Sequence, residues 1–364
     1  MDWYPKNVTS IRQLSERIPI DQALIPILEE ITQRFPISIP EYYLSLIDPD
    51  DPFDPIRRMC VPSPEENIAS GTWDTSGEHA NTVTEGLQHK YSQTALVLST
   101  HQCAMYCRHC FRKRMVGYSE NEVIQNFEAI IQYIRAHPTV DNVLLSGGDA
   151  LFIGNHVLRT YLERLSSIKQ LNFIRIGTRV PATLPQRITE DLELLDILRR
   201  CAVQKPLYLS TQFNHPHELT KDAQKCVQVL MDCGIVVSNQ AVLLHDVNDN
   251  ADTLAALMNG LTRIGVIPYY VFQCRPVRHV QTSFQMPLWR GYDIVEQAKI
   301  QLNGYAKRFR FVLSHRRGKI EILGRLQPDQ MLFKFHQARN AEDHGKVFSL
   351  PVQADQTWLD ENMF

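Results

Sequence analysis

The sequence lacks the features that would place a protein in a membrane or on a nucleic acid. No apolar run reaches the roughly 20 residues that are needed to cross a bilayer. The formal net charge is only -2, so there is no excess of cations to attract nucleic acid or an anionic membrane. The first ten residues, MDWYPKNVTS, carry an acid at position 2 and no apolar core, unlike a signal peptide. We therefore expect a cytoplasmic protein with neither a membrane nor a nucleic acid as partner.

Cysteine is scarce, yet three of the eight cysteines lie within one short segment. Because thiols stay reduced in the cytoplasm, clustered cysteines indicate a metal site or catalysis more than disulfides. Cys103, Cys107 and Cys110 have the spacing C-x3-C-x2-C, and three thiolates so placed can ligate three irons of a 4Fe–4S cluster. No fourth cysteine is near in sequence, so the fourth iron would be open to another ligand. A zinc site with His101 or His109 as fourth ligand is the alternative.

After residue 93, short β-branched runs alternate with longer amphipathic segments. The predicted strands are 94–100, 142–148, 173–179, 207–213, 236–244 and 267–274. The predicted helices are 121–136, 155–168, 189–200, 220–232, 250–264 and 290–303. Such alternation is typical of an α/β fold with a parallel sheet and helical crossovers. Six units fit a partial (β/α)6 barrel or a doubly wound sheet, and in both the functional residues lie at the carboxyl ends of the strands.

Three parts of the chain follow from this pattern. Residues 1–88 are expected to form an N-terminal helical region followed by a connector rich in proline and aspartate. Residues 89–324 form the barrel core, in which the cysteine cluster directly follows the first strand. Residues 325–364 form a short C-terminal extension of mixed character, whose role in oligomerisation cannot be read from the sequence.

The second predicted strand ends in SGGD, formed by Ser146, Gly147, Gly148 and Asp149. Glycines allow backbone to approach a ligand closely, although such a segment alone most often marks a turn. Because it follows the C-x3-C-x2-C segment, SGGD resembles the amino-group-binding motif of the radical S-adenosylmethionine (SAM) superfamily. The resemblance implies that Asp149 holds the methionyl ammonium of SAM. It also implies that the open iron binds SAM and that an electron from the cluster cleaves SAM to methionine and a 5′-deoxyadenosyl radical.

Several separated segments, in order, resemble the lysine 2,3-aminomutase family of that superfamily. These segments are EYYLSLIDPDDPFDPIRR, HKY, CAMYCRHC, LLSGGDAL, IRIGTRVPATLPQRIT, FNHPHE, NQAVLLHDVND and PYYVFQC. The resemblance implies pyridoxal 5′-phosphate (PLP) as a further cofactor, with Lys319 of SHRRGKIEIL as the lysine that forms a Schiff base. A deprotonated lysine amine can condense with an aldehyde. The turn before Lys319 departs from the family's glycine-rich pattern, because it contains Arg316, Arg317 and one glycine, Gly318.

Other positions match the family residue by residue. Arg112 matches the residue that binds the substrate α-carboxylate, for which bidentate arginine geometry is well suited. Lys90 and Tyr91 match the pair near the PLP phosphate and ring, and Gln240 matches a residue near the SAM carboxylate. Thr94 stands where lysine-acting members have another arginine, so one phosphate contact is changed or lost.

The substrate pocket is where the chain departs most from lysine-acting members. Those enzymes hold the distal ammonium of lysine with two acidic residues, and here Arg275 and Ser314 match those positions. A lysine ammonium about 4 Å from Arg275 would meet a repulsion of about 4 kcal/mol at an effective dielectric constant near 20. A distal carboxylate, as in glutamate or aspartate, is therefore favoured. An alternative of equal weight is that Arg275 does not contact the substrate. In that case it replaces the phosphate contact missing at Thr94 or pairs with an internal acid.

These observations together predict a radical SAM, PLP-dependent 2,3-aminomutase that moves an amino group from Cα to Cβ of an α-amino acid. Its expected partners are a small amino acid and a reductant such as flavodoxin or ferredoxin, and a homodimer is one candidate assembly. No cysteine follows Cys274, so the C-terminal zinc site of the lysine enzyme is not expected. The alternatives are an aminomutase that acts on a lysine residue of a protein, another PLP and SAM radical reaction, and a non-catalytic iron–sulfur or zinc protein.

Overall fold

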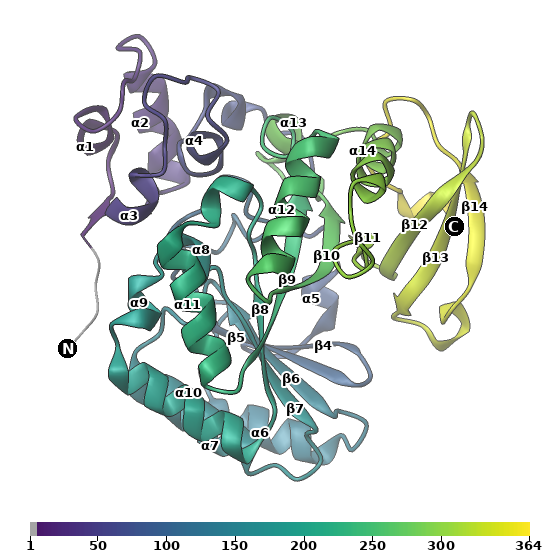
Figure 1. The fold of residues 1–364 in the computed structure, drawn as a ribbon. Helices are drawn as coiled ribbons and strands as arrows, with labels where there is room; N and C mark the ends of the chain where they lie inside the picture. Colours follow the sequence, from purple (N-terminus) through teal and green to yellow (C-terminus); the bar gives the residue numbers. More distant parts are fainter. Residues whose placement is uncertain (1–5) are drawn as a thin grey trace.

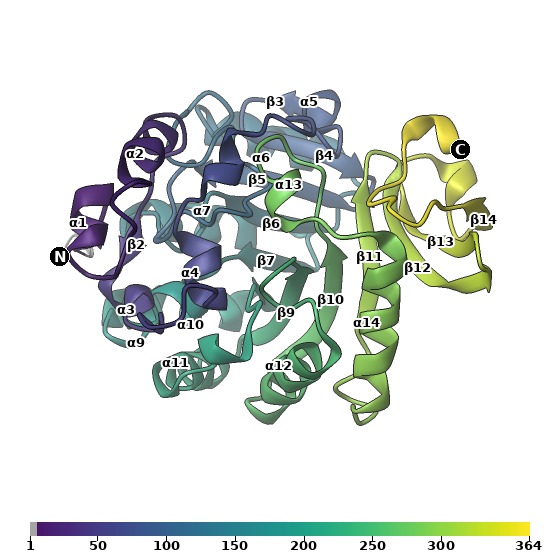
Figure 2. The ribbon, with the colours of Figure 1, turned by 90° about the horizontal axis from the view of Figure 1, so that it is seen from above.

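The computed structural model describes residues 6–364, so residues 1–5, half of the stretch compared above with signal peptides, lie outside it. Its first part is a small helical region (Figure 1). This region contains α1 (Ile11–Ser15), α2 (Ile25–Arg34), α3 (Glu41–Leu44), α4 (Pro55–Cys60) and the strand pair β1 (Asn7–Val8) and β2 (Ile39–Pro40). It packs onto the cysteine loop, because the backbone N–H of Tyr106 donates to the Ser38 carbonyl (3.0 Å) and that of Arg108 to the Met59 carbonyl (2.9 Å). The next helix, α5 (Glu78–Asn81), lies apart from this region, beside β4 (Leu87–Tyr91) of the large sheet (Figure 2).

The rest of the chain is organised around one twelve-stranded sheet. Its strands are β3 (Thr82–Thr84), β4 (Leu87–Tyr91), β5 (Thr94–Thr100), β6 (Asn142–Gly147), β7 (Phe173–Gly177), β8 (Leu207–Thr211), β9 (Val236–Leu243), β10 (Ile267–Gln273), β11 (Arg310–His315), β12 (Gly318–Gln327), β13 (Gln330–Ala338) and β14 (Val347–Pro351). Strands β5 to β11 are parallel, and the flanking strands are antiparallel. The six predicted strands correspond to β5 through β10.

The strands follow one another in the sheet in sequence order, from β3 at one edge to β14 at the other. A doubly wound sheet requires a reversal of strand order, and this sheet has none. Among the described residues the two edge strands do not pair with each other, so the barrel is open. The predicted partial (β/α)6 barrel is confirmed, and the doubly wound alternative is wrong.

The crossover helices lie along the outer side of the curved sheet (Figure 2). They are α6 (Phe127–Ala136), α7 (Asn155–Ser166), α10 (Leu192–Gln204), α11 (Lys221–Asp232), α12 (Ala251–Arg263) and α14 (Leu288–Ile300). The four-residue helices α8 (Val180–Thr183), α9 (Gln186–Thr189) and α13 (Gln281–Phe284) lie in the connections that follow β7 and β10. The helix predicted over 121–136 begins only at Phe127, because the segment before it belongs to the cysteine loop. In residues 6–364 no helix combines the length and the apolar character that a bilayer crossing requires.

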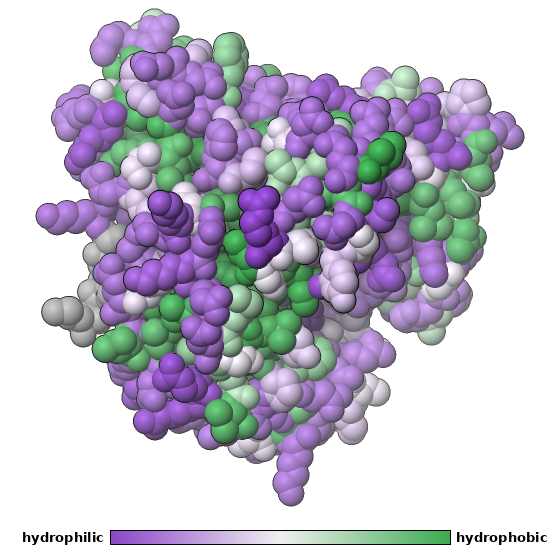
Figure 3. Space-filling model, viewed as in Figure 1, coloured by the Kyte–Doolittle hydropathy of each residue, from purple (hydrophilic) through white to green (hydrophobic). Residues whose placement is uncertain are grey.

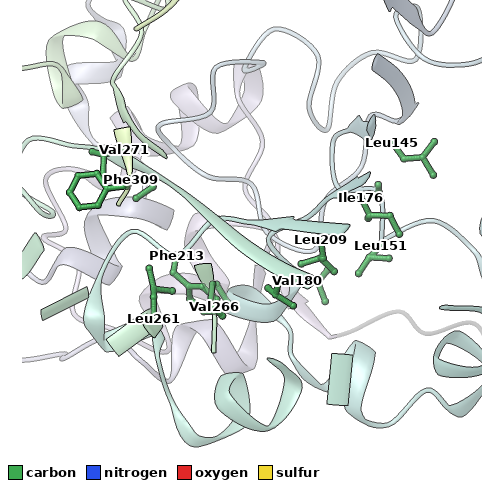
Figure 4. Close-up of a cluster of buried hydrophobic side chains, with 14 of the residues drawn as sticks. Leu145, Leu151, Ile176, Val180, Leu209, Phe213, Leu261, Val266, Val271 and Phe309 are labelled. Carbon is green, nitrogen blue, oxygen red and sulfur yellow. The ribbon is translucent and has the colours of Figure 1, made fainter. Parts of the chain in front are cut away.

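One continuous apolar core joins the sheet to its helices. Leu145, Ile176 and Leu209 come from the adjacent strands β6, β7 and β8, and all three are fully buried (Figure 4). Leu261 adds the inner face of α12 to the same core. Hydrophilic residues dominate the outer face that Figure 3 shows. This core holds the strands in register, so their carboxyl ends present loops at fixed positions.

The C-terminal strands extend this sheet. β12 runs across residue 325, where the C-terminal extension was predicted to begin, and it pairs with β13 along its whole length. The buried Phe333 and Phe335 of β13 belong to the same core as the barrel strands. The extension therefore continues the barrel, and it can contribute side chains to the barrel interior.

Candidate active site

A cavity of about 350 Å³ extends from the carboxyl ends of the parallel strands down to the start of β5. Every residue predicted to bind a cofactor, metal or substrate lines this cavity. They are Lys90, Tyr91, Cys103, Cys107, Cys110, Arg112, Ser146, Gly147, Gly148, Asp149, Gln240, Arg275, Ser314 and Lys319. Residues separated by more than 200 positions in the chain thus share one site.

The three clustered cysteines lie in the irregular loop between β5 and α6, and all are free thiols. Burial, as the first cause, raises the pKa of Cys103 and Cys107 and raises that of Cys110 to about 11. Without a metal, these thiols would therefore keep their protons at neutral pH. Metal binding would have to release those protons, which makes metal affinity pH-dependent.

The spacing of the thiols bears on the zinc alternative. A tetrahedral site with Zn–S bonds near 2.3 Å brings sulfur atoms to roughly 3.8 Å from one another. In the described residues, only His245, Asp246 and Asp249 form a set of three metal-type ligands within 4.8 Å of one another. The three thiols are thus not all within 4.8 Å of one another, as a zinc site would require. His109 lines the cavity, and its Nε2 lies 3.2 Å from the Asn214 amide nitrogen, whereas His101 is not among the lining residues.

The two glycines of SGGD allow a close approach of two backbone segments, whereas the sequence suggested a close approach to a ligand. A Cβ on Gly147 would lie 2.3 Å from the Thr100 carbonyl oxygen, and one on Gly148 would lie 2.2 Å from that of Gln102. Gly147 also has a φ of 121°, which L-residues rarely adopt. The Gly148 N–H donates to Thr100 (2.5 Å). The glycines therefore hold the start of the cysteine loop against the end of β6, a role that the sequence did not suggest.

Asp149 is already fully engaged within the protein. Its carboxylate accepts hydrogen bonds from the Thr178 hydroxyl (2.6 Å), the Arg179 N–H (2.6 Å) and the Leu151 N–H (3.0 Å). Burial raises its pKa, and these hydrogen bonds oppose that rise. The residue thereby fastens the end of β6 to that of β7, and its predicted contact with the methionyl ammonium stays a prediction.

Arg179 is a cavity residue that the sequence analysis missed. Its Nη1 donates to Cys107 Sγ (2.7 Å), and its Nη2 donates to Glu218 (2.6 Å) and to the Tyr43 hydroxyl (3.2 Å). The buried Glu218 balances its charge. The available signal was its place as the last residue of the third predicted strand, 173–179, at the carboxyl end where functional residues were expected.

Arg112 is held in a fixed orientation beside the cysteines. Its Nε donates to Glu78 (3.1 Å), and its Nη1 donates to Ser146 Oγ (3.3 Å) and to the Gly147 carbonyl (3.1 Å). Burial acts to raise the pKa of Glu78, but Arg112 and Arg114 hold it at about 2. Glu78 comes from α5, in the segment predicted as a connector, and no sequence motif marked it.

Lys319 lies in β12, and its amine faces the barrel interior. Nζ donates to Gln337 Oε1 of β13 (3.1 Å) and lies 5.0 Å from the centre of the Tyr91 ring and 5.8 Å from that of Tyr270. Burial lowers the pKa of Lys319 to about 7, and the positive charges of Arg175 and Arg275 contribute. A large share of the amine is therefore unprotonated at neutral pH, as a nucleophilic lysine requires.

Comparisons with known proteins agree with this geometry. Residues 97–258 match the family model described as the radical SAM superfamily. A protein of Aquifex aeolicus that is provisionally named an L-lysine 2,3-aminomutase is 40% identical over 336 residues, which cover 92% of this chain and 89% of that protein. The chain belongs to the lysine 2,3-aminomutase family.

Two further relatives have different substrates in their names. The L-lysine 2,3-aminomutase of Clostridium subterminale is 36% identical and covers 83% of this chain and 72% of that protein. The glutamate 2,3-aminomutase of Clostridioides difficile is 34% identical and covers 84% of this chain and 71% of that protein. The protein is an isomerase of the aminomutase type, and its radical SAM family implies a 4Fe–4S cluster and SAM.

Relative to this family, Arg275 and Ser314 are the departures of interest, and the structure brings them together. Arg275 Nη2 donates to Ser314 Oγ (2.8 Å), and its Nη1 donates to Ser76 Oγ (3.0 Å). The guanidinium carbon lies 4.1 Å from the centre of the Phe111 ring. Burial lowers the pKa of Arg275 to about 10, against the opposing charge of Glu78. Among the described residues, no ion pair of Arg275 with a carboxylate is formed.

The remaining matched residues line the space between these groups. Lys90 Nζ donates to the carbonyls of Ser76 (3.1 Å) and His315 (2.5 Å). Burial lowers the pKa of Lys90 to about 7, and Arg275 and Lys319 contribute. Gln240 lies in β9, next to Tyr270 of β10, and its side chain lines the same cavity.

Proposed function

We propose that the protein is a PLP-dependent 2,3-aminomutase that acts on an α-amino acid with an anionic distal group. One observation supports this above all: the three cysteines, Arg112 and the Lys319 amine line a single cavity. A radical reaction on a cofactor-bound amino acid requires that the source of the radical and the group that holds the substrate share one enclosed space.

The chain's own residues take distinct parts in this proposal. Cys103, Cys107 and Cys110 would hold the cluster, which with SAM supplies the radical that starts the reaction. Lys319 would hold PLP, whose π-system delocalises an unpaired electron. Arg112, fixed by Glu78, has its remaining donors available for the substrate α-carboxylate.

To hold PLP, Lys319 would need an amine that is unprotonated and fixed in position. The pKa of Lys319, about 7, keeps much of the amine unprotonated. Gln337 accepts a hydrogen bond from Nζ and so holds the amine in place when no substrate is attached.

The charge of the cavity supports the anionic substrate. Among the described residues that line it, four are arginines, Arg112, Arg175, Arg179 and Arg275, and two are lysines, Lys90 and Lys319, whose pKa near 7 leaves them charged only in part. Of the arginines, Arg112 pairs with Glu78 and Arg179 with Glu218, which leaves Arg175 and Arg275 without an ion pair among the described residues. Only two lining residues, Glu78 and Asp149, carry carboxylates, and both already accept hydrogen bonds from the protein. An ammonium near Arg275 would be disfavoured by about 4 kcal/mol at 4 Å, roughly a thousandfold in affinity.

The test is a comparison of matched substrates. Anaerobically reconstituted enzyme with SAM and a chemical reductant should convert glutamate or aspartate to the β-amino acid, glutamine more slowly, and lysine least, as read by product mass. Arg275→Asp should lose most of the activity on the acidic substrate but retain SAM cleavage without substrate. Arg278→Asp, an exposed arginine three residues further on, is the control.

Two results would overturn parts of the proposal. If no α-amino acid yields a β-amino product, the aminomutase reaction on free amino acids is wrong, and a lysine residue of a protein becomes the substrate to test. If Arg275→Asp abolishes PLP binding, Arg275 is a phosphate ligand and the acidic substrate must be dropped. A reductant such as flavodoxin, a cytoplasmic location and a homodimer belong to the same proposal.

A further inference from the structure

Near the start of β5, three polar side chains from adjacent strands meet, and two of them, Thr94 and Arg175, line the cavity. Thr94 opens β5 and is paired in the sheet with Asn142 of β6, and Arg175 lies in β7. Arg175 Nη2 donates to Asn142 Oδ1 (2.8 Å), and Asn142 Nδ2 donates to Thr94 Oγ1 (3.1 Å). We call these residues the floor triad. Its hydrogen bonds fix the guanidinium of Arg175 in one orientation.

Arg175 retains hydrogen-bonding capacity that the protein does not use. Its Nε is buried without a hydrogen-bond partner. Among the described residues, no ion pair joins its guanidinium to a carboxylate, and Asn142 accepts its one side-chain hydrogen bond. Burial lowers its pKa, and the nearby Tyr269, Tyr270 and Asp141 oppose this without offsetting it.

The positive charge of Arg175 also acts on Lys319. After burial, Arg175 is the largest contribution to the lowered pKa of Lys319, ahead of Arg275. Two basic groups thus share the lower cavity, and the carboxylates that line the cavity, Glu78 and Asp149, are both engaged elsewhere. A buried cation without a partner is costly, and a bound dianion would compensate it.

We propose that Arg175, oriented by Asn142 and Thr94, binds the phosphate group of the cofactor on Lys319. The inference rests on the proposed attachment of PLP to Lys319 and adds the anchor at the other end of that molecule. It provides a cation that Asn142 connects to Thr94, the position at which the sequence indicated a lost phosphate contact. Arg275 is the weaker candidate, because it follows the carboxyl end of β10 whereas Thr94 opens β5, and the two strands run parallel.

Pyridoxal, which lacks the phosphate, is the matched probe. Anaerobically reconstituted protein is dialysed to equilibrium against PLP or pyridoxal, and the bound cofactor is quantified after release. The wild-type protein should prefer PLP strongly. Arg175→Met should weaken PLP about tenfold to a hundredfold, the range for loss of a charged hydrogen-bond donor, and should change pyridoxal affinity little. Arg175→Lys keeps the charge, so its affinity for PLP should lie between those of the wild type and Arg175→Met.

Arg200→Met is the control, since Arg200 lies on the outer face of α10 with 76% of its side chain exposed. The thermal midpoint and iron content of each variant report whether it folds. Equal weakening of PLP and pyridoxal in a folded Arg175→Met, or no weakening of either, would overturn the phosphate role. A wild-type protein that leaves no pyridoxyl group on Lys319 after borohydride reduction would instead overturn the proposed function.

Discussion

At the scale of single residues, the chemistry of this site depends on groups whose charge the surroundings have changed. Lys319 and Lys90 both have a pKa near 7, mainly because they are buried and because each is surrounded by other cations. Glu78 and Glu66 keep a pKa of about 2 in spite of burial, because each lies between two basic side chains. Burial alone favours the neutral form of both kinds of group. The neighbouring cations reinforce this effect for the two lysines and overcome it for the two glutamates.

The lowered pKa of Lys319 gives a pH-dependent prediction. Only the unprotonated amine can react with an aldehyde, so the rate at which PLP becomes attached should rise with pH around a midpoint near 7. A lysine in water would show that rise near pH 10.4. Borohydride trapping at intervals from pH 5.5 to 9, with peptide mapping, measures the rate at Lys319 alone. Lys90→Met, which removes the other shifted amine, should leave the midpoint close to 7.

The contrary outcome is distinct. Attachment that rises only above pH 9 would show that the amine is solvated and that burial does not control it. A midpoint near 7 that disappears in Lys90→Met would assign the titration to Lys90. Lys319→Met should abolish the trapped product at every pH.

At the scale of elements, the site depends on contacts between loops that follow adjacent strands. The end of β6 carries Gly147 and Gly148 against the backbone of residues 100–102, where the cysteine loop begins. Asp149 extends the connection to the end of β7 by accepting hydrogen bonds from Thr178 and Arg179. Since Arg179 then donates to Cys107, the ends of three successive strands are joined through hydrogen bonds to the thiol loop.

Gly148→Ala tests this connection. The added methyl would lie 2.2 Å from the Gln102 carbonyl oxygen, which is backbone and cannot move without shifting the cysteine loop. We expect a loss of about 1–3 kcal/mol in unfolding free energy and fewer irons per chain after anaerobic reconstitution. Gly304→Ala is the control, because a Cβ there meets no atom within 4 Å. Full iron content in Gly148→Ala would show that the cysteine loop does not depend on this approach.

The sequence predicted the central parallel strands and their helices, but not the flanking strands or the contacts between elements. Period-two and helical patterns located β5 through β10 and their helices, because local periodicity follows directly from which side chains are buried. The same periodicity says nothing about strand order, so it left two architectures open. β13 and β14 were not predicted, although β13 is nine residues long, alternates between buried and partly buried positions and delivers Gln337 to Lys319. Glu78 and Arg179 were missed because their partners are distant in sequence.

At the scale of the whole molecule, the N-terminal region and the barrel are joined at the cysteine loop by a buried group of charges. Glu66, in the segment Pro64–Asn67, accepts hydrogen bonds from Arg108 (2.9 Å to Nε) and from Lys113 (2.6 Å), and both of these residues belong to the cysteine loop. Arg108 also donates to the Phe35 and Pro36 carbonyls. The N-terminal region thereby holds the cysteine loop through contacts that are separate from those of SGGD.

Glu66→Gln should weaken the attachment of the N-terminal region to the cysteine loop. Removing one charge from a buried group leaves Arg108 and Lys113 uncompensated, so we expect a loss of about 3–5 kcal/mol in unfolding free energy at pH 7. Glu65→Gln is the matched control: its carboxylate is about half exposed and pairs with Arg58, so its loss should stay below about 1 kcal/mol. Urea unfolding of both variants, with iron content after reconstitution, measures the difference.

The same pair of variants gives a pH signature. The pKa of Glu66 is about 2 in the folded protein, below the ordinary value of about 4.3. Its contribution is therefore fully present above pH 4.3 and is lost as the pH falls toward 2. The unfolding free energy of wild type and of Glu65→Gln should therefore fall between about pH 4.3 and 2. Glu66→Gln lacks this carboxylate, so its unfolding free energy should change less over the same pH range. If Glu66→Gln unfolds like Glu65→Gln at pH 7 and keeps its iron, the cysteine loop is held by the barrel alone.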